Sequence, residues 1–307
     1  SYQDIAETVL AHFFTNFTAE ERKAMIASAY NDETFRDPDI VPLHSIDTDL
    51  SVAELFHGRT LAFKDLALSL FPYLLTAAKK QEQEQREILI LTATSGDTGK
   101  AALEGFKDVP GTNIMVFYPS EGVSPMQMQQ MQKQEGDNVR VSAIHGNFDD
   151  AQSFLKRVFT NPDVNAYAND KGVLFSSANS INIGRLFPQI VYYVSTYVTL
   201  VDNGAISEGE TFDVIVPTGN FGNILAGYFA KKMGIPIGKL ICASNKNKVL
   251  ADFFETGVYD MNRDFYTTDS PSMDILLSSN FERFLFYAAG EDAKKVDQWE
   301  KDLLETR

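Results

Sequence analysis

The middle of the chain alternates short apolar runs with amphipathic stretches. The apolar runs predict strands at residues 88–93, 114–118, 139–144 and 173–177. Between them, apolar residues at helical spacing predict helices over residues 98–107, 125–134 and 149–160. This alternation is typical of a parallel sheet covered by helices.

A second alternating segment follows nearer the C-terminal end. The run at 212–216 predicts a strand, residues 217–222 form a glycine-rich turn, and apolar spacing predicts a helix over 222–233. Another apolar run predicts a strand over 239–243. The helix predicted over 185–201 closes the first alternating region.

The remaining pattern divides the chain into two expected lobes. Residues 2–30 predict two helices, and residues 64–78 predict one. We expect a smaller α/β lobe at 88–195, inserted into a larger lobe that is built from 1–87 and 196–307.

Composition and charge narrow the class of protein. The net charge of −15 argues against binding nucleic acid or anionic membranes, since both require basic surface. The single cysteine excludes an intrachain disulfide and fits a cytoplasmic setting. The start is polar and acidic, unlike a signal peptide, and the apolar run near 189–201 is shorter than the ~20 residues of a membrane span.

The two ends of the sequence predict a piece of a longer protein. The chain begins at Ser1 without a methionine, and it ends at Arg307 inside a helical pattern. We therefore expect truncation at both ends.

Lys64 stands out because its neighbours in sequence are apolar. It follows a glycine-containing turn, lies beside Phe63 and Leu66, and opens the helix predicted over 64–78. Partial removal from water disfavours the ammonium form and lowers the pKa, so this amine is a candidate for Schiff-base chemistry. Taken alone, the segment favours a simpler explanation, in which the stem covers the core and the amine reaches water.

The glycine-rich turn after the strand at 212–216 changes that balance. Glycines allow close backbone approach, and the first N–H groups of the following helix suit a phosphate dianion. A desolvated lysine together with a lysine-free phosphate cradle predicts pyridoxal 5'-phosphate as cofactor, with Lys64 at its aldehyde carbon. The predicted cofactor-binding residues are Lys64, Gly219, Asn220, Phe221, Gly222 and Asn223.

Two further segments are candidate anion sites. The loop 94–98 carries hydroxyl groups and glycine N–H groups that suit a carboxylate or phosphate, and it is equally explained as a helix start capped by Asp97 or Thr98. Arg185 follows Asn179 and Asn182 and is a candidate to clamp an anion bidentately, although the residues alone favour a surface arginine.

Four motifs together resemble the threonine synthase family in order and approximate spacing. They are Phe56-His-Gly-Arg-Thr-Leu-Ala-Phe-Lys-Asp65, Thr92-Ala-Thr-Ser-Gly-Asp-Thr-Gly99, Asn179-Ser-Ile-Asn-Ile-Gly-Arg185 and Pro217-Thr-Gly-Asn-Phe-Gly-Asn223. The resemblance covers almost the whole chain. Arg59 differs from the proline of many family members, and the chain is shorter than is usual in the family.

The resemblance implies an enzyme of pyridoxal-phosphate fold type II. Its two lobes would be three-layer parallel-sheet lobes, with the cofactor in the cleft between them. The implied reaction converts O-phosphohomoserine and water to L-threonine and phosphate, by γ-elimination and then addition of water at Cβ. Lys64 would act as the base, and Ser95, Thr98 and Arg185 would stabilise the departing phosphate.

The resemblance also implies which residues meet the substrate. These are Thr94, Ser95, Gly96, Asp97, Thr98, Asn179, Asn182 and Arg185. The protein would be a monomer or homodimer that acts on a small molecule and needs no metal.

Other functions remain open at this point. A related phospho-lyase would release 2-oxobutanoate, and a serine or threonine dehydratase of the same fold would use the same cofactor. A non-catalytic phosphometabolite-binding protein is the alternative from another class.

Overall fold

The computed structural model describes residues 1–120, 123–146 and 148–305. The chain forms two compact units, Ser1–Ala205 and Ile206–Arg307, and each contains parallel strands. The predicted α/β class is confirmed. The predicted lobes, 1–87 with 196–307 and 88–195, divide the chain differently from these units, and the lobe assignment stays a prediction.

The first unit begins with helices α1 (Tyr2–Leu10) and α2 (Ala19–Ala29). Each starts at a capping box, in which Ser1 pairs with Asp4 and Thr18 pairs with Glu21. Strands β1 (Leu43–Asp47) and β2 (Leu50–Ala53) then form an antiparallel hairpin that the hydrophobic pattern did not predict.

The single helix predicted over 64–78 is wrong. Helix α3 (Asp65–Leu68) is followed by a separate helix, α4 (Phe71–Gln81). Pro72 lies in the first turn of α4, and it cannot lie inside one continuous helix without losing a hydrogen bond and contacting the carbonyl of Leu68.

A four-stranded parallel sheet is the centre of the first unit, and all four predicted strands are confirmed. Its strands lie in the order β5-β4-β3-β6. The strands are β3 (Glu87–Ala93), β4 (Thr112–Pro119), β5 (Val139–Ile144) and β6 (Val173–Ser176). The helices of this region are α5 (Asp97–Phe106), α6 (Pro125–Gln132), α7 (Phe148–Thr160) and α8 (Pro162–Asp170).

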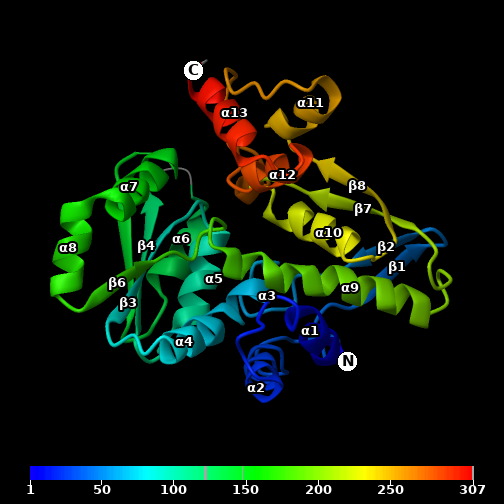
Figure 1. Ribbon diagram of the computed structural model, residues 1–307, viewed down its shortest axis with the longest axis horizontal. Helices are drawn as coiled ribbons and strands as arrows, with labels where there is room; N and C mark the ends of the chain where they lie inside the picture. The colour runs from blue at the N-terminus through cyan, green and yellow to red at the C-terminus, as the bar shows by residue number, and fades with distance from the viewer. Residues whose placement is uncertain (121–122, 147, 306–307) are drawn as a thin grey trace. The chain divides into compact units, whose positions relative to one another are not determined.

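Alternate residues of the strands pack on opposite faces of this sheet. Figure 1 shows helices on both sides of its strands. On one face Ile90 belongs to a core that includes Phe106 of α5 and Met131 of α6. On the other face Leu91 packs with Leu155 of α7. Helices therefore cover both faces, as a parallel sheet requires.

The stretch that follows β6 contains a 3-10 turn, η1 (Ile183–Arg185), and helix α9 (Phe187–Asp202). The helix predicted over 185–201 is confirmed in type and begins two residues later, with Pro188 in its first turn. Among the described residues, no helix combines the length and the apolar character that crossing a membrane requires.

In the second unit, strands β7 (Phe212–Pro217) and β8 (Ile237–Ala243) pair in parallel. Helix α10 (Gly222–Lys232) connects them. Both strands and the helix were predicted. The unit continues with α11 (Val249–Thr256), η2 (Pro271–Met273), α12 (Phe281–Ala288) and α13 (Ala293–Glu305).

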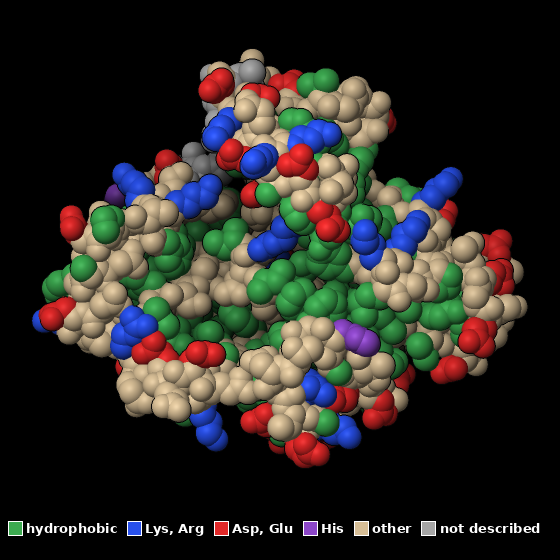
Figure 2. All heavy atoms as spheres, viewed as in Figure 1, with side chains coloured by type: hydrophobic (Ala, Val, Ile, Leu, Met, Phe, Trp, Pro, Cys, Tyr) green, Lys and Arg blue, Asp and Glu red, His purple; other side chains and the backbone are tan. Residues whose placement is uncertain are grey.

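Acidic side chains are dispersed over the face of the molecule that the space-filling view shows. Figure 2 shows Asp and Glu side chains at separate points of the visible face, with Lys and Arg side chains among them. The charge of −15 is therefore not gathered into one acidic patch on this face.

Candidate active site

Two of the predicted anion-binding segments follow neighbouring strands of the sheet in the first unit. Strand β3 pairs in parallel with β6, with Ile90 opposite Ser176. The chain proceeds from β3 to β4 and β5 on one side, and then returns to place β6 on the other side of β3. The carboxyl ends of β3 and β6 therefore meet where the strand order reverses, which is where open parallel sheets bind ligands.

Asn179 joins the two loops at this edge. Its amide nitrogen donates to the carbonyl of Ala93 at 2.7 Å, and its amide oxygen accepts from the N–H of Ala93 at 3.0 Å. Asn182 holds its own turn in a similar way, through the Ser177 carbonyl and the Gly184 N–H, both at 3.0 Å. These contacts fix the loops, and the role of both amides in binding substrate stays a prediction.

Thr94 organises the loop that follows β3. Its buried hydroxyl oxygen accepts from the N–H of Gly96 at 2.9 Å and from the N–H of Gly99 at 2.8 Å. The prediction that Asp97 or Thr98 caps helix α5 is wrong. The N-cap residue is Gly96, which has no side chain to accept a hydrogen bond from the first turn. Thr94 satisfies the N–H of the first helical turn from outside the helix. Ser95 and Thr98 are half-buried beside it.

Two buried threonines near this loop give a matched test of that assignment. Thr94→Val leaves two buried N–H groups without their acceptor and should lower the free energy of unfolding by about 2–4 kcal/mol. No residue that the structure describes bonds the buried hydroxyl of Thr92, so Thr92→Val should be neutral or stabilising by up to about 1 kcal/mol. Urea unfolding of both variants measures the difference, and equal losses would contradict the assignment.

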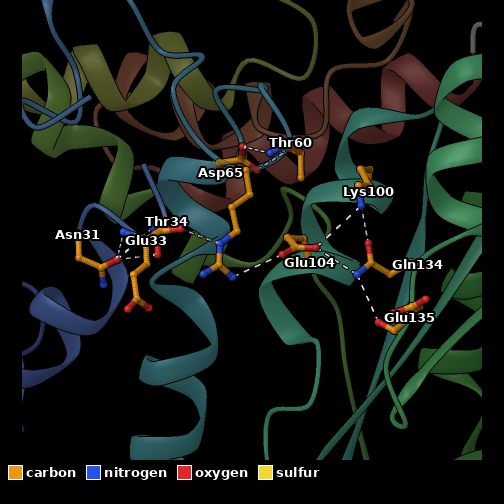
Figure 3. Close-up of polar contacts among 10 residues, drawn as sticks. Asn31, Glu33, Thr34, Thr60, Asp65, Lys100, Glu104, Gln134 and Glu135 are labelled. Atoms are coloured by element: carbon orange, nitrogen blue, oxygen red, sulfur yellow. Dashed lines mark hydrogen bonds and ion pairs between the residues drawn. The ribbon is translucent and has the colours of Figure 1, made fainter. Parts of the chain in front are cut away.

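The turn before Lys64 is held by Asp65. The backbone N–H and hydroxyl of Thr60 donate to the Asp65 carboxylate at 2.8 and 2.6 Å (Figure 3). A side chain at Gly58 would overlap this carboxylate, and Leu61 takes a positive φ of 62° inside the turn. The sequence thus folds into a tight turn that presents Lys64 at the start of α3.

The amine of Lys64 is buried and paired. Its Nζ lies 3.2 Å from Oδ2 of Asp97 and 5.4 Å from the ring centre of Phe63, and only 8% of the residue is exposed. Burial lowers the pKa of Lys64, while the nearby Asp97 carboxylate opposes that change. The simpler explanation, an amine in water, is wrong.

Arg185 is a buried cation, so the surface arginine favoured by its residue pattern is also wrong. Only 3% of it is exposed, its Nη1 donates to the Ala178 carbonyl at 3.0 Å, and its buried Nε has no partner among the described residues. No described carboxylate forms an ion pair with it, and burial lowers its pKa to about 10. Because a buried charge without a counter-ion is costly, this guanidinium is suited to receive an anion.

The predicted phosphate loop lies in the second unit. Phe221 precedes α10 in the left-handed region, with φ 64°, and its buried ring packs 5.2 Å from that of Phe281. The Ser278 hydroxyl donates to the Gly219 carbonyl at 2.6 Å, and the Asn280 amide donates to the Asn220 carbonyl at 3.0 Å. With these carbonyls bonded and the ring buried, the loop can offer an anion the backbone N–H groups at the helix start.

Two positions of this loop are packed so closely that they leave little room for a side chain, and both are glycines. A Cβ at Gly219 would come within 3.1 Å of Met273, and a Cβ at Gly222 would come within 3.3 Å of the Asn280 amide. Asn223 lies in the first turn of α10. The binding of cofactor by residues 219–223 stays a prediction.

Several supporting residues were missed by the sequence analysis. Gln127 of α6 donates to Asp97, and Ser278 and Asn280 support the phosphate loop. Arg59 donates to Glu104 of α5 at 3.4 Å. Glu104 also accepts from Gln134 at 3.1 Å, as Figure 3 shows. Only the capping Ser124 before Pro125 was a local signal that placed Gln127 in a first helical turn.

Comparison with known proteins shows the family to which the chain belongs. Residues 40–292 match the model of the pyridoxal-phosphate dependent enzyme family. The chain is 44% identical to human threonine synthase-like 1, in an alignment that covers 89% of this chain. It is 38% identical to threonine synthase of Saccharomyces cerevisiae, in an alignment that covers 99% of this chain. It spans 37% of the human protein and 61% of the yeast protein.

A solved structure shows the same relationship. Threonine synthase from Brucella melitensis, with pyridoxal phosphate bound, is 41% identical and has a TM-score of 0.87, with 99% of this chain and 62% of that chain covered. The expected fold type II is thereby confirmed. The family match over most of the chain shows that the chain belongs to the pyridoxal-phosphate-dependent enzymes.

Proposed function

We propose that the protein containing this chain is a cytoplasmic threonine synthase, which converts O-phosphohomoserine and water to L-threonine and inorganic phosphate. The observation that carries the proposal is the pair of buried cations in the first unit. Lys64 is an amine with a lowered pKa, and Arg185 is a guanidinium without a described ion-pair partner. Similarity to the yeast and Brucella threonine synthases supports this choice of substrate.

Each unit by itself offers a group that suits the cofactor of the family. In the first unit we propose the buried amine of Lys64 for its aldehyde carbon, and in the second unit we propose the N–H groups of the loop 219–223 for its phosphate. When bound, pyridoxal phosphate withdraws electrons from the α-carbon of an amino acid, which makes the α-proton removable.

Lys64 is the residue we propose to move protons. A lowered pKa leaves more of the amine neutral, and only the neutral amine accepts a proton. It would take the proton from Cα, give that proton up so that the amine is neutral again, and then take one from Cβ. The electrons of the broken Cβ–H bond would form the Cβ–Cγ double bond as phosphate departs from Cγ. Asp97, at 3.2 Å, stabilises the ammonium that forms.

Arg185 and the loop 94–98 are proposed to receive the negative charge of the substrate. Among the described residues the guanidinium donates to one carbonyl, that of Ala178, and it has further N–H groups for the departing phosphate. Ser95 and Thr98 would add hydroxyl donors there. Because the site is buried, such contacts are stronger than they would be in water.

The test is product analysis with the full-length protein, pyridoxal phosphate and O-phosphohomoserine in ¹⁸O-labelled water. Threonine carrying the label at its hydroxyl, formed in equal amount with phosphate, supports the proposal. Phosphate released with 2-oxobutanoate would instead support a phospho-lyase. Absence of phosphate release would overturn both.

A further inference from the structure

Gln127 reaches the carboxylate that contacts Lys64. It lies in the first turn of α6, where its N–H is bonded by the hydroxyl of Ser124 at 3.2 Å. The same hydroxyl donates to the Gln127 amide oxygen at 3.1 Å. Its amide nitrogen then donates to Oδ1 of Asp97 at 2.5 Å. Both ends of this amide are therefore fixed.

Each oxygen of the Asp97 carboxylate accepts from one of these two side chains. Oδ1 accepts from Gln127, and Oδ2 accepts from the Nζ of Lys64 at 3.2 Å. Hydrogen bonds to an ionised carboxylate are short and strong, so this pair of contacts restricts rotation of the carboxylate. Rotation would carry Oδ2 away from the amine.

Packing at Gly96 holds Gln127 in this position. Gly96 has φ 148°, and a Cβ there would overlap the Gln127 amide. The glycine leaves room for an amide packed directly over the loop that leads into α5. Gln127 is therefore seated between the loop and the helix cap, and it is not a freely moving surface side chain.

We propose that Gln127 is a positioning residue, whose side-chain amide holds the Asp97 carboxylate in the orientation in which it meets Lys64. The inference rests on the proposed function for its importance to catalysis, since Lys64 is the proposed base. The contact itself is independent of any reaction.

Other groups also face the Lys64 amine, and they set what the variants should do. Asp97 from α5 and Asp65 from α3 stabilise the ammonium form, whereas Arg185 from η1 and burial disfavour it. Weakening the contact of Lys64 with Asp97 should therefore lower the pKa of Lys64. A second carboxylate beside Asp97 should raise that pKa.

The experiment measures how readily Lys64 is acetylated as a function of pH in the cofactor-free full-length protein. Peptide mass spectrometry quantifies the label on Lys64, and only the neutral amine reacts. Gln127→Met keeps the length of the side chain but removes the donor, so labelling at one pH below the pKa should rise about threefold. Gln127→Glu has the same shape and adds negative charge, so labelling should fall about threefold.

Matched controls lie on the exposed side of the same helix. Gln130→Met and Gln130→Glu make the same chemical changes at an exposed position and should leave the Lys64 labelling profile at its wild-type pH. Circular dichroism checks that each variant is folded. Shifts of opposite sign at position 127 alone support the proposal.

Profiles of both Gln127 variants that coincide with the wild type, or that shift in one direction, would overturn it. Shifts of one sign would mean general loosening of the loop. If the shifts are opposite and O-phosphohomoserine is not converted, the positioning role stands and the proposed function fails.

Discussion

Replacing Lys64 with alanine is expected to lower the turnover of O-phosphohomoserine by the full-length protein at least about 10³-fold. The reason is that the proposed function gives this one amine two tasks, to hold the cofactor and to move protons. The structure gives it the burial and the Asp97 contact that those tasks need. Product formation is measured with saturating pyridoxal phosphate, so that weak cofactor binding is not mistaken for lost chemistry.

Lys80→Ala is the matched control, because Lys80 is an exposed lysine of the same unit. It should keep wild-type turnover. Borohydride treatment followed by peptide mapping gives a second measurement, in which the cofactor should be found on Lys64 in the wild type and on no lysine in Lys64→Ala. Full turnover by Lys64→Ala would end the assignment of this residue as the base.

Arg185→Met is expected to stabilise the ligand-free protein and to impair catalysis. Removing a buried cation that has no described ion-pair partner should raise the free energy of unfolding by about 1–2 kcal/mol, even though its bond to the Ala178 carbonyl is lost. The loss of the proposed phosphate contact should lower kcat/KM about 10³-fold. Urea unfolding and product analysis measure the two effects.

Arg22→Met is the matched control, because Arg22 is also largely buried but is paired. It donates to Glu7 at 3.0 Å and to the Phe14 carbonyl at 3.3 Å. The same substitution at Arg22 leaves the Glu7 carboxylate without its ion-pair partner. It should lower the free energy of unfolding without changing kcat/KM. If Arg185→Met is destabilising and retains wild-type kcat/KM, then Arg185 has only a structural role.

The sequence by itself predicted most elements of the sheet region, because each depends on a local pattern. Apolar runs such as Ile88–Ala93 form strands that are buried on both faces. Such a run can be recognised in the sequence without knowing which strands lie beside it. The hairpin of β1 and β2 was missed because its residues are largely exposed, so they carry little hydrophobic signal. The motif order and the lysine identified the family for the same local reason.

Only the tertiary structure determined which distant residues lie next to one another. The order β5-β4-β3-β6 brings Asn179 against Ala93, 86 residues earlier in the chain. Pairing across such distances depends on which strands become neighbours, and no local pattern specifies that choice.

The burial of Arg185 and the contacts of Asp97 with Lys64 and Gln127 have the same origin. From its sequence, an arginine in a first helical turn is expected to be exposed. In the folded chain the segments packed around Arg185 remove its charge from water. The sequence therefore determined the elements and the chemical groups. The packing of distant segments determined which groups lost water and which found partners, and this sets their charge and their reactivity.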